Sequence, residues 1–166
     1  MSPKAVLIGI PGSGKSTIGK HLARVLEVDF KDTDQEIEKT AGMSISDIFI
    51  QLGEPAFREM ERIAVLDSLK NHEGVLALGG GAILDPVTRQ ALKAENVVWL
   101  DVSLADAAHR VGLNTSRPLL LGNVRGTLKK LMDDRHDLYK EVASHKVETG
   151  GLTPSAVAKQ IAKLVA

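Results

Sequence analysis

Residues 9–17 read GIPGSGKST and come at the end of the first apolar run of the chain, Ala5–Ile8. The pattern G-x-x-x-x-G-K-[ST] is met by Gly9, Gly14, Lys15 and Ser16. Glycines let backbone amides point into one concavity, and the N-terminus of the helix that follows adds partial positive charge. The stretch therefore predicts a loop that binds nucleotide phosphates, with the lysine on the outer phosphates and the serine hydroxyl facing Mg²⁺.

Short apolar runs alternate with longer stretches of helical period, which is typical of a parallel sheet with crossover helices. Five strands are expected, at Ala5–Ile8, Val28–Lys31, Val75–Leu78, Val97–Val102 and His145–Glu148. The clearest helices are expected from Thr17 to Leu26, from Glu54 onward and from Pro154 to Val165. The pattern predicts an α/β fold in which helices cover both faces of a five-stranded parallel sheet.

Length and composition predict one domain over residues 1–166, because 43% hydrophobic residues suffice for one sizeable core. Lys and Arg together number 21, as do Asp and Glu, so no charge excess argues for nucleic acid or a membrane surface as partner. The absence of cysteine excludes disulfides and thiolate metal sites and fits a cytoplasmic protein. No leader pattern and no apolar run of membrane-spanning length is found.

One stretch does not fit the alternating pattern. Residues 112–123 read GLNTSRPLLLGN, in which turn-forming residues surround a run of three leucines without a clear period. We expect an ordered but movable loop here; an ordinary surface connection is the alternative.

The carboxylate that serves the metal has two candidates. Asp101 ends the apolar run Val97–Val102, and Asp32 follows the expected strand Val28–Lys31. Both would lie at the carboxyl edge of a parallel sheet, where the phosphate loop also lies. Position in the sequence does not decide between them.

Three further motifs follow expected strands or lie on an expected helix. In DTDQE, residues 32–36, Thr33 and Glu36 predict a capping box that would leave the flanking carboxylates of Asp32 and Asp34 facing different ligands. Arg58 and Glu61 lie three residues apart on one helix face, where a surface ion pair is the simplest interpretation. The glycines at 79–81 indicate that the backbone approaches another group closely.

Taken in order, the motifs GIPGSGKSTIG, DTD, FRxxE, LGGGA, TSRPLL and DRHDLY resemble the shikimate kinase family, and the resemblance covers nearly the whole chain. It implies a three-layer P-loop kinase fold with a mobile lid at about residues 112–124. It also implies transfer of the γ-phosphoryl of ATP to the 3-hydroxyl of shikimate, giving shikimate 3-phosphate and ADP, in the pathway to chorismate and the aromatic amino acids. The members of this family are usually monomers, so a monomer is expected.

The resemblance assigns the acceptor side of the site. Arg58 and Arg135 would hold the shikimate carboxylate with the amides of Gly80 and Gly81, and a planar guanidinium suits this because it meets a carboxylate bidentately. Glu61 would orient Arg58. Asp34 would contact the reacting hydroxyls as base or orienting group. The expected pocket walls are Pro11, Phe49, Phe57, Pro118 and Leu119.

The resemblance also assigns the donor side. The expected nucleotide contacts are Gly12, Ser13, Gly14, Lys15, Ser16, Thr17, Arg110, Arg117 and Pro154. Lys15 and the lid residue Arg117 would touch the transferred phosphate. Ser16 and Asp32 would serve Mg²⁺, the carboxylate through water, which leaves Asp101 a structural or secondary role.

Other functions remain possible for the motifs taken singly. A gluconate kinase or a nucleoside monophosphate kinase would keep the phosphate loop but gives no reason for LGGGA together with DTD and FRxxE. A nucleotide-binding regulator without transfer activity would be expected to have lost some of the charged site residues. Asp133 and Asp134 could weaken the grip of Arg135 on a carboxylate unless both point to solvent.

Overall fold

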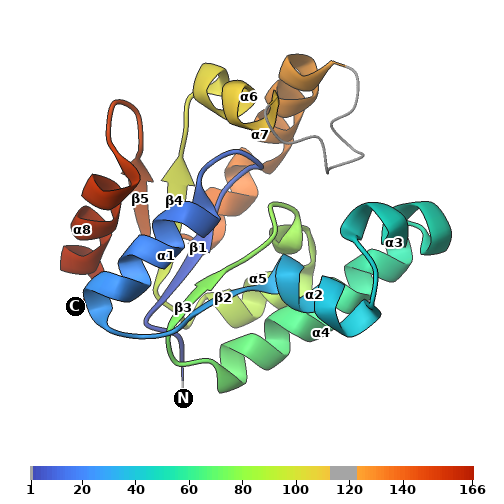
Figure 1. Ribbon diagram of the computed structural model, residues 1–166, viewed down its shortest axis with the longest axis horizontal. Coiled ribbons are helices and arrows are strands. Elements are labelled where there is room, and N and C mark those ends of the chain that lie inside the picture. The colour runs from blue at the N-terminus through green and yellow to red at the C-terminus, as the bar shows by residue number, and fades with distance from the viewer. Residues whose placement is uncertain (1, 113–122) are drawn as a thin grey trace.

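The computed structural model describes residues 2–112 and 123–166, which form three layers around a parallel sheet (Figure 1). The sheet has the strand order β2-β3-β1-β4-β5, and every neighbouring pair is parallel. Its strands are β1 (Ala5–Ile8), β2 (Phe30–Asp32), β3 (Val75–Ala77), β4 (Val97–Asp101) and β5 (His145–Glu148). The predicted α/β fold with a five-stranded parallel sheet is confirmed.

Successive residues of a strand point to opposite faces of the sheet, and the central strands of this chain carry apolar residues on both faces. Helices therefore cover both faces. On one face, Val6 and Ile8 of β1 pack with apolar residues of α4 (Glu54–Asn71), α5 (Pro86–Leu92), α6 (Leu104–Gly112) and α7 (Val124–Val142). On the other face, Ala5 and Leu7 pack with α1 (Lys15–Leu26) and α8 (Pro154–Val165). The buried strand β1 therefore presents the residues that follow it, the phosphate loop, at the centre of the molecule.

A separate apolar cluster lies beside the sheet. Ile37 of α2 (Thr33–Ala41), Ile48 of α3 (Ile45–Leu52) and Phe57 of α4 are its buried members. Figure 1 shows α2 and α3 on one side of the phosphate loop, at the right of the view, and α6 with the beginning of α7 above it. These two groups of helices flank the carboxyl edge of the sheet.

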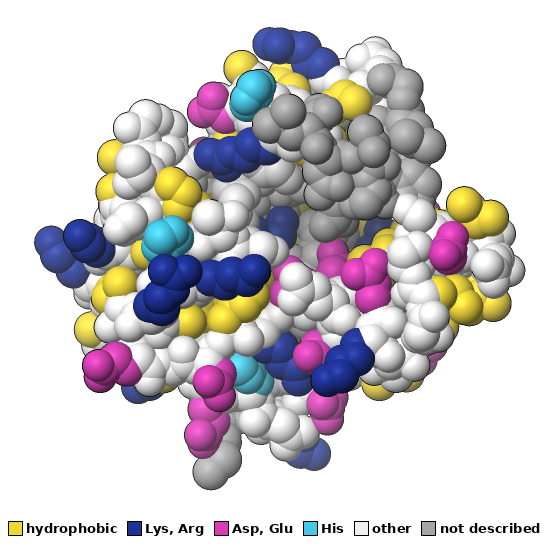
Figure 2. All heavy atoms as spheres, viewed as in Figure 1, with side chains coloured by type: hydrophobic (Ala, Val, Ile, Leu, Met, Phe, Trp, Pro, Cys, Tyr) yellow, Lys and Arg dark blue, Asp and Glu magenta, His cyan; other side chains and the backbone are white. Residues whose placement is uncertain are grey.

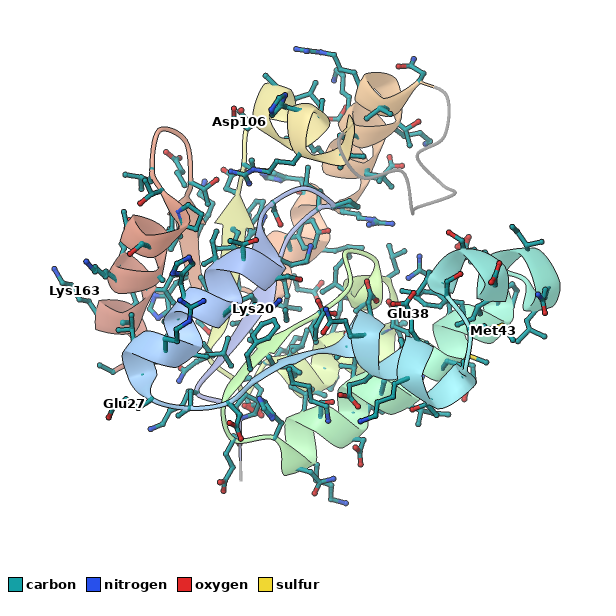
Figure 3. The ribbon with its side chains drawn as sticks, in the orientation of Figure 1. Lys20, Glu27, Glu38, Met43, Asp106 and Lys163 are labelled. Atoms are coloured by element: carbon teal, nitrogen blue, oxygen red, sulfur yellow. The ribbon has the colours of Figure 1, made fainter. Side chains whose placement is uncertain are left out.

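Strand β2 begins two residues later than the sequence predicts. Glu27, at the end of α1 in Figure 3, takes the left-handed conformation with φ 57°, and the amide of Val28 donates to the carbonyl of Ala23. Residues 27 and 28 therefore still complete the end of the helix, as in a common C-cap. The strand shifts accordingly and ends on Asp32.

The predicted capping box at the start of α2 is wrong. The N-cap is Asp32, whose Oδ1 accepts from the amides of Asp34 at 2.9 Å and Gln35 at 3.4 Å. Thr33 is buried instead, and its hydroxyl donates to the carbonyl of Ala77 at 3.4 Å and accepts from the amide of Gly79 at 3.3 Å. Buried backbone groups need such partners, so this side chain ties α2 to the end of β3.

The middle of the predicted lid, residues 113–122, lies outside the described residues. Its outermost positions belong to helices, because Gly112 ends α6 and Val124 begins α7 after the N-cap Asn123. Among the residues described, no helix combines the length and the apolar character needed to cross a membrane.

Candidate active site

The loop between β1 and α1 has the backbone that its glycines permit. Gly12 and Gly14 have φ values of 83° and 90°, a conformation in which other residues are strained, and Gly14 is the N-cap of α1. Arg110, near the end of α6, donates from Nη1 to the carbonyl of Gly12 at 3.0 Å. The loop is thus placed at a helix N-terminus with a guanidinium beside it, an arrangement that attracts phosphate.

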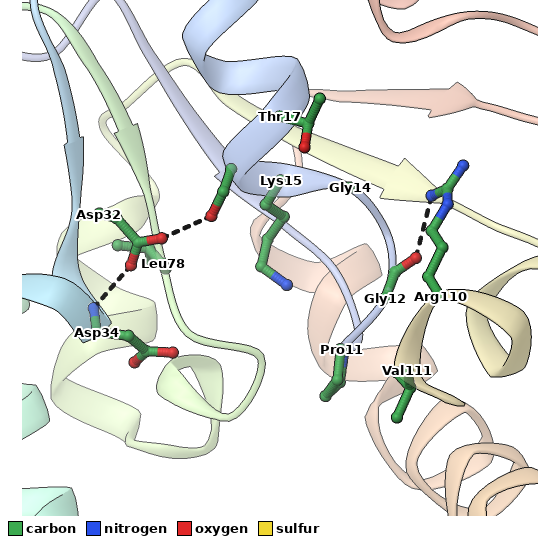
Figure 4. A pocket seen from close by; sticks show the side chains of 11 residues that line it. Pro11, Gly12, Gly14, Lys15, Thr17, Asp32, Asp34, Leu78, Arg110 and Val111 are labelled. Atoms are coloured by element: carbon green, nitrogen blue, oxygen red, sulfur yellow. Dashed lines mark hydrogen bonds between the residues drawn. The ribbon is translucent and has the colours of Figure 1, made fainter. Parts of the chain in front are cut away.

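Lys15 lies along this loop. Its Nζ donates to the carbonyl of Gly9 at 2.8 Å and to that of Ile10 at 3.1 Å. An ammonium group has three donors and can exchange such contacts for phosphate oxygens. Figure 4 shows the side chain between Pro11 and Thr17, reaching back along the loop.

A cavity of about 290 Å³ opens over the loop (Figure 4). It is lined by Pro11, Gly12, Gly14, Lys15, Ser16, Thr17, Asp32, Asp34, Leu78, Arg110 and Val111. Most of the predicted nucleotide contacts are therefore brought together. Of the described ones, two are not among the lining residues: Ser13 is fully buried within the loop, and Pro154 is exposed at the start of α8.

The carboxylate beside the phosphate loop is that of Asp32. The hydroxyl of Ser16 donates to its Oδ2 at 2.7 Å. Asp101 ends β4 elsewhere, and its Oδ2 lies 3.9 Å from the Nζ of Lys146. Hydroxyl and carboxylate oxygens are ligands that Mg²⁺ accepts, and this ion is commonly held by one or two protein groups plus water and phosphates. In the described part of the chain no group of three or more His, Cys, Asp or Glu side chains could hold a metal.

The glycines that follow β3 are the point at which the predicted acceptor residues meet. A methyl group on Gly79 would lie 2.6 Å from Oδ1 of Asp34, and one on Gly81 would lie 2.5 Å from Nη1 of Arg58. A methyl group on Gly80 would lie 3.2 Å from Nη1 of Arg135. Each separation is shorter than an ordinary carbon contact, so side chains from α2, α4 and α7 close directly on this backbone.

Arg58 and Glu61 form a partly buried pair rather than a surface pair. Nη1 of Arg58 donates to Oε1 of Glu61 at 2.7 Å, and only 4% of Glu61 is exposed. Burial raises the pKa of Glu61 to about 7, the charge of Arg58 opposes this rise, and the Asp34 carboxylate adds to it. The carboxyl group thus holds Arg58 in place, as predicted, and also titrates near neutral pH.

Arg135 is buried on α7, with 6% of its surface exposed. The neighbouring acids do not crowd it, because Asp133 pairs with Lys129 at 2.9 Å and Asp134 with Lys130 at 3.0 Å on the exposed face of the helix. A buried guanidinium requires an anion or carbonyl partner. The two arginines and the two carboxylates of the cluster all lie against the turn at residues 79–81. Figure 2 shows a hollow near the middle of this face of the molecule, with basic and acidic side chains around it.

Sequence reasoning missed two polar groups that shape this region. The sequence suggests that Thr33 caps a helix, but its hydroxyl accepts a hydrogen bond from the amide of Gly79. Tyr139 is buried, and its hydroxyl donates to the carbonyl of Gly80 at 2.7 Å. Its spacing was a usable signal, since residues four apart, such as Arg135 and Tyr139, share a helix face.

The expected wall residues are only partly described. The rings of Phe49 and Phe57 pack with centroids 4.9 Å apart, and the guanidinium of Arg58 lies 5.3 Å from the ring centre of Phe57. Arg117, Pro118 and Leu119 lie outside the described residues.

Comparison with known proteins identifies the family. A model of the shikimate kinase family matches residues 11–166. A shikimate kinase of Thermobifida fusca is 54% identical over 161 residues, covering 97% of this chain and 94% of that protein, and one of Salinispora arenicola is 52% identical over 166 residues, covering 100% and 99%.

Solved structures agree with this match. A shikimate kinase from Acinetobacter baumannii in complex with shikimate has a TM-score of 0.95 at 35% identity, covering 99% of this chain and 93% of that one. One from Aquifex aeolicus has a TM-score of 0.82 at 33% identity, covering 97% and 94%. With motifs, fold and relatives in agreement over almost its whole length, this chain belongs to the shikimate kinase family.

Proposed function

We propose that this protein transfers the γ-phosphoryl group of ATP to the 3-hydroxyl of shikimate, giving shikimate 3-phosphate and ADP. The observation that carries the proposal is that two arginines and two carboxylates converge on the turn at residues 79–81, next to a phosphate loop. Shikimate offers one carboxylate and three ring hydroxyls, which is the complement of such a cluster. The relative from Acinetobacter baumannii was solved with shikimate bound, and its fold superposes on nearly all of this chain.

The arginines recognise the substrate carboxylate. Arg58 is oriented by Glu61 and lies against Gly81, while Arg135 lies against Gly80. Two planar guanidinium groups at adjacent positions of one turn can each present paired N–H donors to a carboxylate. The amides of Gly80 and Gly81 complete the anion site.

Asp34 orients the reacting hydroxyl and accepts its proton. Its carboxylate belongs both to the cavity over the phosphate loop and to the cluster at Gly79, so it stands between the donor and the acceptor. The 3-hydroxyl oxygen forms a bond to the γ-phosphorus, the bond from that phosphorus to the β–γ bridging oxygen breaks, and ADP leaves. Because the transition state is loose, alignment and charge neutralisation contribute more than proton removal.

Lys15, Ser16 and Asp32 act on the donor side. Lys15 neutralises the outer phosphates, and Arg117 of the lid is assigned the same task on closure. Ser16 and Asp32, joined at 2.7 Å, would hold Mg²⁺. The ion supplies charge neutralisation of the nucleotide phosphates. Arg110, Thr17 and Pro154 are assigned to the remainder of the nucleotide.

The ligands proposed are small molecules, and the protein is proposed to act as a cytoplasmic monomer. The balanced charge of 21 basic and 21 acidic residues offers no general attraction to nucleic acid or to an anionic membrane. ATP and Mg²⁺ are both available in the cytoplasm.

The test is a coupled assay of ADP release with Mg²⁺ and ATP, with and without shikimate, followed by identification of the product. ADP release that depends on shikimate, with the phosphate on the 3-oxygen, is expected. ADP release that shikimate does not stimulate would point to another acceptor, and ATP binding without release would point to a nucleotide-binding regulator.

A further inference from the structure

We infer that Tyr139 is a positioning residue of the acceptor site: its hydroxyl holds the carbonyl of Gly80 and so fixes the turn on which the donor loop and the carboxylate-binding arginine meet. The inference rests on the proposed function and adds a residue to it. It starts from a hydrogen bond of 2.7 Å between groups that are both buried.

The hydroxyl of Tyr139 is a constant donor. Burial raises the pKa of this phenol to about 12, and the charge of Arg135 opposes the rise. The group therefore stays protonated at neutral pH. Since buried carbonyls without a donor are costly, removing this hydroxyl leaves the turn free to relax toward another partner.

Gly80, which this hydrogen bond holds, lies between the phosphate loop and Arg135. A methyl group on its α-carbon would lie 3.0 Å from Cδ of Pro11 and 3.2 Å from Nη1 of Arg135. Pro11 lines the cavity over the phosphate loop. Any displacement of Gly80 therefore changes its distance from the donor side and from the carboxylate-binding side together.

The ring of Tyr139 is held in turn by the core. It lies 5.8 Å from the ring of Trp99 on β4, centre to centre, and Trp99 is itself 7% exposed. Tyr139 also follows Arg135 by one turn of α7, so the same helix face carries the arginine and the donor that fixes the turn beneath it. Helix α7 therefore fixes both Arg135 and the hydroxyl group that holds the carbonyl of Gly80.

The test is Tyr139→Phe, which removes the hydroxyl and keeps the ring. We expect the shikimate KM to rise about tenfold, because loss of one hydrogen bond to a buried group costs about that factor. We expect kcat to fall as well, since small misplacements of reactants are costly, and the ATP KM to stay unchanged.

The matched control is Ser144→Ala. Ser144 also donates a hydroxyl to a backbone carbonyl, that of Glu95 at 3.0 Å, but lies beside the start of β5, away from the glycine turn. A purely structural loss lowers the melting temperature and the folded fraction of either variant and leaves both KM values where they were. A rise in shikimate KM in the phenylalanine variant alone is the expected result.

Unchanged shikimate KM and kcat in Tyr139→Phe would overturn the inference. Failure of the proposed function is a separate outcome, because it shows in the wild-type protein as ADP release that does not depend on shikimate. In that case the rate of amide hydrogen exchange at Gly80 and Gly81 tests the positioning role by itself. Exchange faster than in the wild type in Tyr139→Phe but not in Ser144→Ala supports the role, and an exchange rate in Tyr139→Phe equal to that of the wild type contradicts it.

Discussion

The two halves of the site are built in different ways. The donor half is built mainly on one continuous segment, residues 9–17, most of which lines a surface cavity together with Asp32 and Arg110. The acceptor half is assembled from side chains of three helices around one turn of backbone, and its charged members are largely buried: Asp34 is 8% exposed, Glu61 4% and Arg135 6%.

This difference separates a general function from a specific one. A loop of backbone amides binds any nucleotide phosphate, because the amides recognise charge and little else. Guanidinium groups held in fixed positions present directed N–H donors, so a cluster of two arginines and two carboxylates favours a ligand whose carboxylate and hydroxyls match these positions. The acceptor half therefore decides what receives the phosphate.

The largest expected effect comes from the residue that both halves share. Asp34→Asn keeps the size of the side chain but removes its charge, so we expect kcat to fall by about 100-fold or more. ATP affinity, measured by calorimetry, should stay close to that of the wild type. Asp133→Asn, on the exposed face of α7, is the control and should leave kcat unchanged. A nearly normal kcat in the Asp34 variant would refute its role.

The next effect tests the acceptor half alone. Arg58→Lys and Arg135→Lys retain the positive charge and lose the planar fork, so the shikimate KM should rise about tenfold or more in each, with the ATP KM unchanged. Arg62→Lys is the control on the helix of Arg58, because Arg62 is partly exposed and pairs with Glu59 and Asp85. If either site variant binds shikimate as the wild type does, that arginine does not hold the carboxylate.

A smaller effect tests the donor half. Asp32→Asn preserves the helix cap, since asparagine is an equally good N-cap residue, but removes the charge next to Ser16. We expect the Mg²⁺ concentration for half-maximal activity to rise about tenfold. Asp101→Asn should leave this concentration unchanged. If only Asp101→Asn raises this Mg²⁺ concentration, the metal site lies at the end of β4 and not beside Ser16.

The last effect falls on stability and not on activity, and it concerns the pH dependence. Glu61 has a folded-state pKa of about 7 against an ordinary value of 4.5, so the folded protein binds this proton more tightly than the unfolded chain does. The resulting stabilisation is complete below pH 4.5 and is lost as the pH rises through 7, with a slope of at most about 1.4 kcal/mol per pH unit. Urea unfolding of the wild type and Glu61→Gln should show a difference in the free energy of unfolding that shifts in favour of the uncharged glutamine variant as the pH rises across this window. A constant difference would contradict the assigned pKa.

The same contrast explains what the sequence could predict. The donor loop and the strand that leads into it were predictable, because GIPGSGKST acts through local backbone geometry. The positions of β1 and β5 were also predictable, whereas β2 was misplaced because the unusual backbone of Glu27 continues the helix end. The roles of Thr33 and Tyr139 depend on contacts with Gly79 and Gly80, which lie 46 and 59 residues away in sequence. Local spacing places Tyr139 on the helix face of Arg135 but does not identify the glycine partner of either residue.

For the acceptor half, the family motifs therefore predict more than the single residues do. Arg58 and Glu61 alone suggest a surface ion pair, yet their pair is partly buried and closes on Gly81. Asp32 and Asp101 could not be ranked by sequence position, and the hydrogen bond from Ser16 distinguishes their surroundings.

The central claim is that the partly buried Arg58 and the buried Arg135 select the acceptor through its carboxylate. The most direct measurement compares kcat/KM for shikimate and for its uncharged methyl ester in the wild-type protein at saturating Mg²⁺ and ATP. The account predicts a loss of about 100-fold for the ester, because the N–H donors of Arg58 and Arg135 would meet a neutral ester in place of a carboxylate. Equal use of acid and ester would contradict it.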